Sequence, residues 1–158
     1  YEANLFLVRA LNEGIADYFG YIYSGSPNSF SSTFGSLEAV RRLDAPGDSE
    51  FKVVTKAAWN RYLTEPRFYS NSSCTRMCRA YDLAPYFSRA LYDMAVKNAV
   101  SGDAKGVREV IAAQIIQALP KLARYISDAE SKNEMISPEE LLAELKVQMN
   151  LSSKGIRP

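Results

Sequence analysis

Residues 3–23 read ANLFLVRALNEGIADYFGYIY, and this stretch decides the fold class of the chain. Its apolar side chains recur at steps of three and four residues, which is the spacing of an α-helix. They occupy more than one face of that helix, so we expect the helix to lie largely inside a larger body. The apolar positions are Leu7, Ala10, Leu11, Gly14, Ile15, Tyr18, Phe19 and Ile22.

The second half of the chain continues the helical spacing. Apolar residues predict helices over 83–100 and over 104–128, and Pro120 predicts a kink in the second of these. The sequence SPEE at 137–140 combines an N-cap Ser, a Pro at the first helical position and a capping-box Glu, which predicts a helix over 138–150. Together these segments favour a mainly α fold of about five helices.

Between these helical segments, residues 24–82 are rich in Gly, Pro, Ser and Asn, which is typical of loops. Within this region we expect a short helix over 37–43 and an irregular chain over 64–79. Residues 51–63 favour a helix, and the Val-Val-Thr run at 53–55 leaves a strand as the alternative.

The 158 residues suffice for one globular domain with a single core. The formal net charge of +1 disfavours a nucleic-acid partner. The apolar runs are shorter than the roughly 18 to 20 residues that cross a bilayer, so we expect no membrane-spanning segment. We therefore expect one helical domain over 1–158, made of a first helix at 1–23, a loop-rich region at 24–82, a helical bundle at 83–150 and a tail at 151–158.

The chain contains no His. This excludes Ser-His-Asp and Cys-His catalysis by the chain alone and removes the commonest metal ligand. The two cysteines, Cys74 and Cys78, are too few for a closed zinc site. On a helical turn their spacing places both sulfurs on one face, which favours a disulfide in an exported protein over two free thiols.

Two acidic residues interrupt the first predicted helix. Glu13 and Asp17 are four residues apart, so their carboxylates share one helical face. Burying a carboxylate without a cation or hydrogen-bond donors is unfavourable. A metal ion is one way to satisfy both groups, and a solvated helix face is the alternative.

The sequence NEGIADYF at 12–19 resembles the third-ligand helix of the gluzincin zinc metallopeptidases. The pattern N-E-x-x-x-D occurs there in thermolysin-like enzymes, and N-E-G-F-A occurs in aminopeptidase-N-like enzymes. The resemblance implies that Glu13 ligates zinc, that Asp17 orients a zinc-binding His, and that Asn12 is a supporting neighbour. In the family the other ligands and the catalytic Glu lie on a preceding H-E-x-x-H helix, which these 158 residues do not contain.

The sequence YDLAPYFSRAL at 81–91 is similar to the segment of aminopeptidase-N-like enzymes in which a Tyr begins a helix and stabilises the oxyanion of the reaction intermediate. The resemblance implies that role for Tyr81, because a phenol can donate a hydrogen bond to the developing negative charge. The chain has Ala84-Pro85 where the family usually has Gly. A plain aromatic anchor at a helix start is the alternative for Tyr81.

The resemblance implies that the chain is the helical C-terminal subdomain of a zincin-type metallopeptidase, a fragment of a longer protein. Its expected partners are the upstream segment with the other zinc ligands and a peptide substrate. We expect zinc in the complete protein, none on this chain alone, and a secreted or cell-envelope location. Two alternatives remain: a catalytically inactive peptidase-like binding protein, and an unrelated helical interaction module with both carboxylates in solvent.

Overall fold

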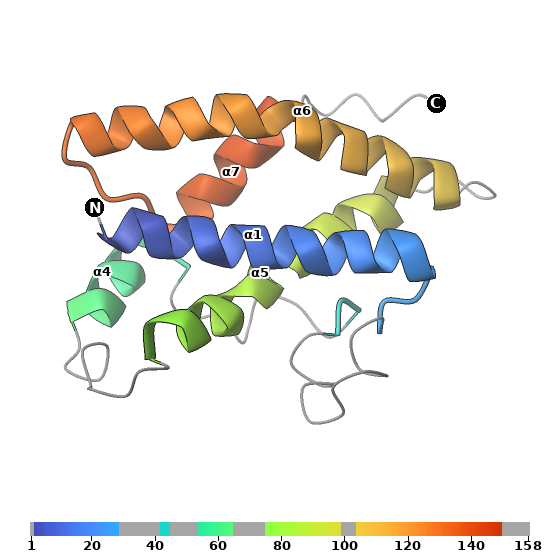
Figure 1. Cartoon of the computed structure of the whole chain (residues 1–158), viewed down its shortest axis with the longest axis horizontal. Coiled ribbons are helices and arrows are strands. Elements are labelled where there is room, and N and C mark those ends of the chain that lie inside the picture. Colours follow the sequence, from blue (N-terminus) through green and yellow to red (C-terminus); the bar gives the residue numbers. More distant parts are fainter. Residues whose placement is uncertain (1, 29–41, 45–53, 65–74, 99–103, 150–158) are drawn as a thin grey trace.

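The computed structural model contains five α-helices in the residues that it describes and no strand among them (Figure 1). This confirms the predicted mainly α fold of about five helices. The described residues are 2–28, 42–44, 54–64, 75–98 and 104–149. The helices are α1 (Glu2–Ser24), α4 (Lys56–Thr64), α5 (Thr75–Asn98), α6 (Ala104–Ser131) and α7 (Pro138–Gln148).

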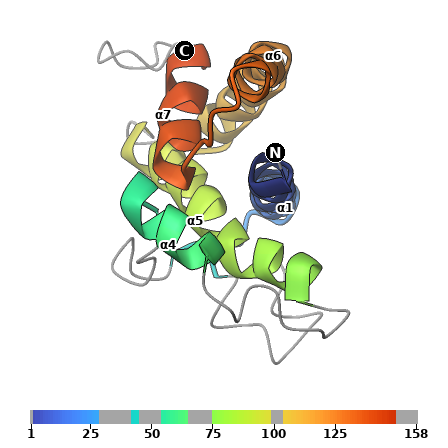
Figure 2. The same cartoon turned by 90° about the vertical axis from the view of Figure 1, so that its left-hand side faces the viewer.

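The first helix, α1, packs against the two other long helices. In Figure 1, α6 runs above α1 in the opposite direction, while α5 begins below α1 and crosses behind it, running from left to right as α1 does. Figure 2, which looks along α1, shows α4 and α7 together to one side of it. Helix α1 contacts both α5 and α6, while α7 contacts α6 and α4. Helices α5 and α6 also contact each other, so the helix with the predicted metal ligand is one of three long helices that pack together.

Gly14 makes a close backbone contact between α1 and α5. A Cβ atom at Gly14 would lie 2.7 Å from the carbonyl oxygen of Ala84 and 2.7 Å from the Cβ of Phe87. It would also lie 3.1 Å from the backbone nitrogen of Ser88. Real Cβ atoms do not approach other atoms at 2.7 Å, so only glycine permits this helix spacing.

The hydrophobic core is continuous across all five helices. Trp59 joins α4 to it, since its buried ring lies 5.8 Å from the ring of Phe6 and stacks on Tyr62 at 5.5 Å. The burial and close packing of such large apolar side chains stabilise the fold more than any other interaction. The largest fully buried side chains are Trp59, Tyr18, Phe87, Leu7, Leu43, Leu91, Ile111, Ile115, Leu122, Leu141, Leu145 and Met149.

The predicted start of the last helix is confirmed. The Ser137 hydroxyl accepts a hydrogen bond from the backbone N–H of Glu140 at 3.2 Å, and the Glu140 carboxylate accepts one from the backbone N–H of Ser137 at 2.8 Å. Pro138 occupies the first helical position. The remaining free N–H of this first turn, that of Glu139, donates to the carbonyl of Val54 at 3.0 Å. The N-terminus of α7 is thus fully hydrogen-bonded, in part by a distant segment.

The connection from α6 to α7 contains a helix stop that the sequence analysis did not predict. Asn133 adopts a left-handed backbone conformation with φ of 60°. Its N–H donates to the carbonyl of Glu130 at 3.0 Å, and the N–H of Glu134 donates to that of Ala129 at 2.8 Å. These two bonds form a Schellman motif, in which Asn replaces the usual glycine. The motif satisfies carbonyl groups that the end of α6 would otherwise leave unpaired.

Three predicted boundaries are corrected. Helix α5 begins at Thr75 and not at 83, and Thr64 is the last residue of α4. The prediction of an irregular chain over 64–79 is therefore wrong for Thr64 and for residues 75–79. Buried Ala80 packs this added part of α5 into the core, and tertiary packing outweighs the weak local helical pattern.

The other two corrections concern residues 37–43 and 51–63. Arg42 and Leu43 are not helical, and residues 37–41 lie outside the described residues. Helix α4 begins only at Lys56, because the Thr55 hydroxyl accepts a hydrogen bond from the N–H of Ala58 at 3.3 Å and so caps the helix. Thr55 is not in a strand, so the strand alternative does not hold for it.

Candidate functional site

The structure places the two predicted acidic residues of α1 in different environments. Asp17 is buried, with 1% of its surface exposed, whereas Glu13 is half-buried. The interpretation with both carboxylates in solvent is therefore wrong for Asp17. Asn12 is exposed, because one residue along a helix turns the side chain by about 100°.

The residues from the two family-like segments lie on helices that touch. Glu13 precedes Gly14, whose backbone packs against Ala84, and Ala84 lies about one turn beyond Tyr81 on α5. Tyr81 is 39% exposed. It lies in the second turn of α5, so the expectation that Tyr81 begins a helix is wrong. The contact at Gly14 joins the segment with Glu13 and Asp17 to the segment with Tyr81.

The donor atoms near Glu13 and Asp17 limit which metal site these residues can form. Among the described residues, no three Asp, Glu, Cys or His side chains are grouped closely enough to hold a metal ion. Protein zinc sites use at least three protein ligands. The chemistry of Glu13 suits one carboxylate ligand of such a site, and the others would have to come from elsewhere. The predicted Cys74–Cys78 disulfide lies outside the described side chains and stays a prediction.

A buried amide that the sequence analysis missed holds the beginning of α1. Asn4 is almost fully buried, and its Nδ2 donates to the carbonyl of Glu134 at 3.1 Å. Its Oδ1 accepts a hydrogen bond from the backbone N–H of Ile136 at 3.0 Å. Asn4 thus ties α1 to the connection between α6 and α7, more than 100 residues away. The available signal was a polar residue within an apolar helical stretch.

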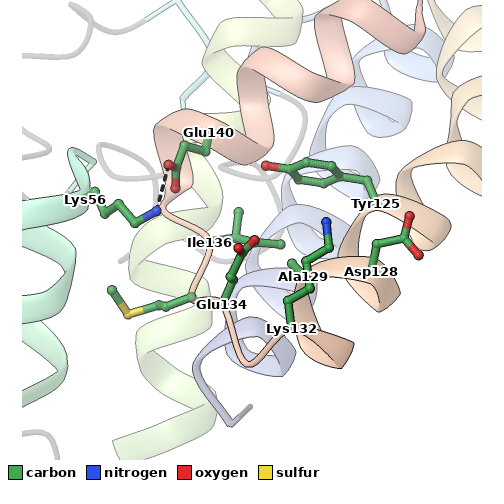
Figure 3. Close-up of a pocket in the computed structure, with 9 residues that line it drawn as sticks. Lys56, Tyr125, Asp128, Ala129, Lys132, Glu134, Ile136 and Glu140 are labelled. Atoms are coloured by element: carbon green, nitrogen blue, oxygen red, sulfur yellow. Dashed lines mark hydrogen bonds and ion pairs between the residues drawn. The ribbon is translucent and has the colours of Figure 1, made fainter.

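A pocket of about 200 Å³ opens beside that connection (Figure 3). The Lys56 ammonium of α4 lies 3.0 Å from the Glu140 carboxylate of α7 on its wall, and the Tyr125 ring of α6 lies on the opposite wall. Sequence reasoning missed this pocket because its residues come from separate segments. The lining residues are Lys56, Tyr125, Asp128, Ala129, Lys132, Glu134, Met135, Ile136 and Glu140.

Two groups of this pocket have shifted acidities. Burial raises the pKa of the Glu140 carboxyl, but hydrogen bonds from the Ser137 backbone and from Lys56 outweigh it, so that the pKa lies below its usual value. Burial and the nearby carboxylates of Glu140 and Glu144 raise the pKa of the Tyr125 phenol. Charges of both signs line the pocket, and this mixture does not point to one class of ligand.

A second, wider groove of about 420 Å³ lies between α5 and α7. Apolar side chains, among them Tyr86, Met94 and Leu142, form part of its lining. Charged residues of both signs, including Asp93 and Lys146, also line it. It contains none of the residues that the sequence analysis predicted for a site.

The C-terminal end of α1 is held by α6. The Tyr18 hydroxyl donates to the carbonyl of Arg108 at 3.3 Å, and the Arg108 guanidinium lies 4.9 Å from the centre of the Tyr21 ring. Burial raises the pKa of the Tyr18 phenol far above its usual value, so it stays protonated as a donor. The positive charge of Arg108 near the C-terminal end of α1 also interacts favourably with the dipole of that helix. These contacts fix which side of α6 faces α1.

Comparison of the chain with models of protein families, with curated proteins and with solved structures found no match. No helix in the described part of the chain is both long and apolar enough to cross a membrane. The function of the chain therefore has to be inferred from its own residues and from their placement.

Proposed function

We propose that this chain is the helical C-terminal part of a zinc-dependent metallopeptidase and that Glu13 is one of its zinc ligands. The observation that supports this most is the burial of Asp17 one turn after the half-buried Glu13, within the sequence NEGIAD. Charged residues on an ordinary amphipathic helix lie in solvent. A buried carboxylate needs hydrogen-bond donors or a cation around it, and orienting a metal ligand is the role that the resemblance gives to this position.

The proposal gives each residue a separate role. Glu13 contributes a carboxylate oxygen to the metal, and Asp17 accepts a hydrogen bond from the ring N–H of a zinc-binding His. Exposed Asn12 supports this turn of the helix. Tyr81, on the helix that packs against Gly14, would donate a hydrogen bond from its hydroxyl to the oxygen on which negative charge develops. Zinc, when bound, polarises the peptide carbonyl and lowers the pKa of a water molecule.

Because the chain has no His, the proposal requires ligands from another segment. We place them on an upstream part of the same protein, which is called the longer protein below. The substrate is a peptide, and a secreted or cell-envelope location belongs to the same proposal.

The test is Glu13→Gln in the longer protein, with Glu109→Gln as the matched control. Glu109 is exposed on α6 and pairs only loosely with Lys105, at 3.8 Å. We expect purified wild type and Glu109→Gln to contain one zinc per chain and to hydrolyse peptides, while Glu13→Gln loses both properties and keeps its helical circular dichroism. Zinc content is measured by elemental mass spectrometry.

Two results would count against the proposal. Zinc and activity that survive in Glu13→Gln would remove the ligand role of Glu13. A wild-type protein that binds peptides but holds no zinc would instead favour the catalytically inactive, peptidase-like binding protein.

A further inference from the structure

One side of α6 has a strip of exposed residues that begins and ends with charges of opposite sign. Arg108 marks the side of α6 that faces α1, since its carbonyl accepts the Tyr18 hydrogen bond, and the strip lies roughly 20° to 80° further around the helix. Buried Ile111 lies on the other side of Arg108, so the strip is turned away from the core. This α6 strip consists of Lys105, Ile116, Leu119, Ala123 and Glu130.

Helix α1 extends this exposed surface. Leu5 and Tyr23 are each nine residues from Gly14, which is two and a half helical turns, so both lie on the side of α1 opposite its contact with α5. They are 50% and 96% exposed. Asn12 and Ala16 are exposed on the same side of α1. We call the exposed sides of the two helices together the α1–α6 face, which consists of the α6 strip and of Leu5, Arg9, Asn12, Ala16 and Tyr23.

The α1–α6 face is one continuous surface. Figure 2 shows α6 above α1, with α4 and α7 on one side of this pair. Leu119 lies only about 20° around α6 from the side that faces α1, and half-buried Phe19 lies between Tyr18 and Leu5 on α1. The helices have 23 and 28 residues, so they are about 35 and 42 Å long, and with diameters of about 10 Å they form a face of roughly 700 Å². This area is close to the roughly 800 Å² that each partner buries in a stable interface.

The order of residues along the α6 strip is complementary to itself. In a two-fold symmetric pair the same surface of both copies meets, and an axis perpendicular to α6 makes the two α6 helices antiparallel. If this axis passes between Ile116 and Leu119, Ile116 of one copy meets Leu119 of the other. Lys105 is eleven residues before Ile116, and Glu130 is eleven residues after Leu119. The same axis therefore places Lys105 of each copy opposite Glu130 of the other.

Helix α1 has the same kind of complementarity. Exposed Arg9 lies about 40° around α1 from Leu5, and Glu13 lies about 40° beyond Arg9 along the same edge of the face. In an antiparallel pair of α1 helices with the axis beside Leu11, Arg9 of each copy lies opposite Glu13 of the other. Charges of both signs on this edge thus fit a second copy of the chain, since each finds its opposite there.

The contacts between α1 and α6 allow one axis to serve both helices. Two hydrogen bonds fix how the helices lie along each other, from Tyr18 to Arg108 and from Asn4 to Glu134. The residues halfway between these bonds are Leu11 on α1 and Lys121 on α6. Lys121 is only about one helical turn from the midpoint of the α6 strip, so the two centres of symmetry lie at nearly the same level.

We propose that the α1–α6 face joins two copies of this chain in a two-fold symmetric dimer. Its apolar residues provide the contact area, and the ion pairs of α6 and α1 set the antiparallel register. Exposed apolar patches with a polar rim mark protein interaction sites. The inference goes beyond the proposed function and does not depend on zinc. The Glu13 carboxylate has two oxygens, so a contact with Arg9 of the second copy leaves an oxygen for a metal ion.

The first experiment is analytical ultracentrifugation of the 158-residue chain over a wide range of concentration. We expect a reversible equilibrium between monomer and dimer. Ile116→Lys brings two charges into the centre of the interface and should raise the dimer Kd by about tenfold or more. Val147→Lys, at an exposed position of α7, is the matched control and should leave the Kd unchanged.

Charge reversal tests the antiparallel register. Lys105→Glu and Glu130→Lys each place like charges opposite one another twice in the dimer, and each should raise the Kd by about tenfold. The double variant restores both pairs with reversed signs and should return the Kd to within about threefold of the wild type. Lys121→Glu, roughly 140° around α6 from Ile116, is the matched control and should have little effect. Circular dichroism shows whether each variant keeps its helices.

Three results would overturn the proposal. The first is a chain that stays monomeric at every concentration. The second is a dimer that Ile116→Lys leaves as stable as the wild type, because the interface would then lie on another face. The third is a double variant that remains as weak a dimer as Lys105→Glu or Glu130→Lys alone, because the two residues would then not lie opposite each other.

Discussion

Gly14 of α1 and Ala84 of α5 lie so close together that a Cβ on Gly14 would be 2.7 Å from the Ala84 carbonyl oxygen. The obstructing atom belongs to the backbone of α5, so it cannot move aside as a flexible side chain would. The contact sets the spacing of the two helices that carry Glu13 and Tyr81. The packing of α1 on α5 thus requires glycine at this position, whatever the role of the NEGIADYF sequence that contains it.

Gly14→Ala should destabilise the chain by about 1–3 kcal/mol, the usual result of overpacking a tight core. For a protein of this size that corresponds to a fall in melting temperature of about 2–4 °C per kcal/mol. Ala113→Leu adds a larger side chain at an exposed position of α6 and should change the melting temperature little. Thermal unfolding followed by circular dichroism measures both variants. If Gly14→Ala were as stable as the wild type, α1 and α5 could move apart at Gly14 without a loss of stability, and the close contact would not be required.

The buried Asn4 amide makes two hydrogen bonds to the connection between α6 and α7. Asn4→Ala leaves the buried N–H of Ile136 and the partly buried carbonyl of Glu134 without these partners. We expect a loss of about 1–3 kcal/mol in the free energy of unfolding, measured by urea titration. Asn12→Ala, at an exposed position of the same helix, should lose much less. Equal losses for the two variants would refute the role of the buried amide.

Periodicity and capping patterns predicted the elements whose stability is local. Helices α1 and α6 have long apolar repeats, and the Ser137–Glu140 capping box marks the start of α7. The early start of α5 was missed, because Ala80 is buried only by contacts that form in the folded chain. In the same way, Asn4 and the pocket beside Lys56 depend on contacts between residues far apart in the chain, and one sequence does not reveal which distant residues meet.

The carboxylate of Glu140 predicts a pH dependence of stability. Its pKa is lower in the folded state than its usual value near 4.5, because hydrogen bonds from Ser137 and Lys56 outweigh the effect of burial. A carboxyl group with a lowered folded-state pKa stabilises the fold above its unfolded pKa, and this contribution is lost as the pH falls through the folded pKa. The wild type should therefore lose stability below about pH 4.5 partly through this group.

Glu140→Gln tests this dependence, with Glu139→Gln as the neighbouring control at an exposed position. Above about pH 6 we expect Glu140→Gln to be less stable than the wild type by up to about 1 kcal/mol, which is the range of partly exposed ion pairs. The difference should shrink as the pH is lowered to about 3. Melting temperatures of both proteins across this pH range provide the measurement. If the stability difference between them grew as the pH fell, the pKa of Glu140 would not be lowered in the folded state.

Asp17 offers the sharpest test of the metal site, because Asn has nearly the same shape and lacks the charge. In the longer protein we expect Asp17→Asn to weaken zinc affinity by about 10- to 100-fold, since a neutral amide holds the ring N–H of a ligand His less firmly. The affinity is measured by competition with a chromophoric chelator, alongside the melting temperature of the metal-free protein. Burial makes the second measurement necessary, because Asp17 also lies within the packing of α1. A loss of metal-free stability with unchanged zinc affinity would show that Asp17 serves packing alone, and the assignment of Glu13 and Asp17 to one metal site would then fail.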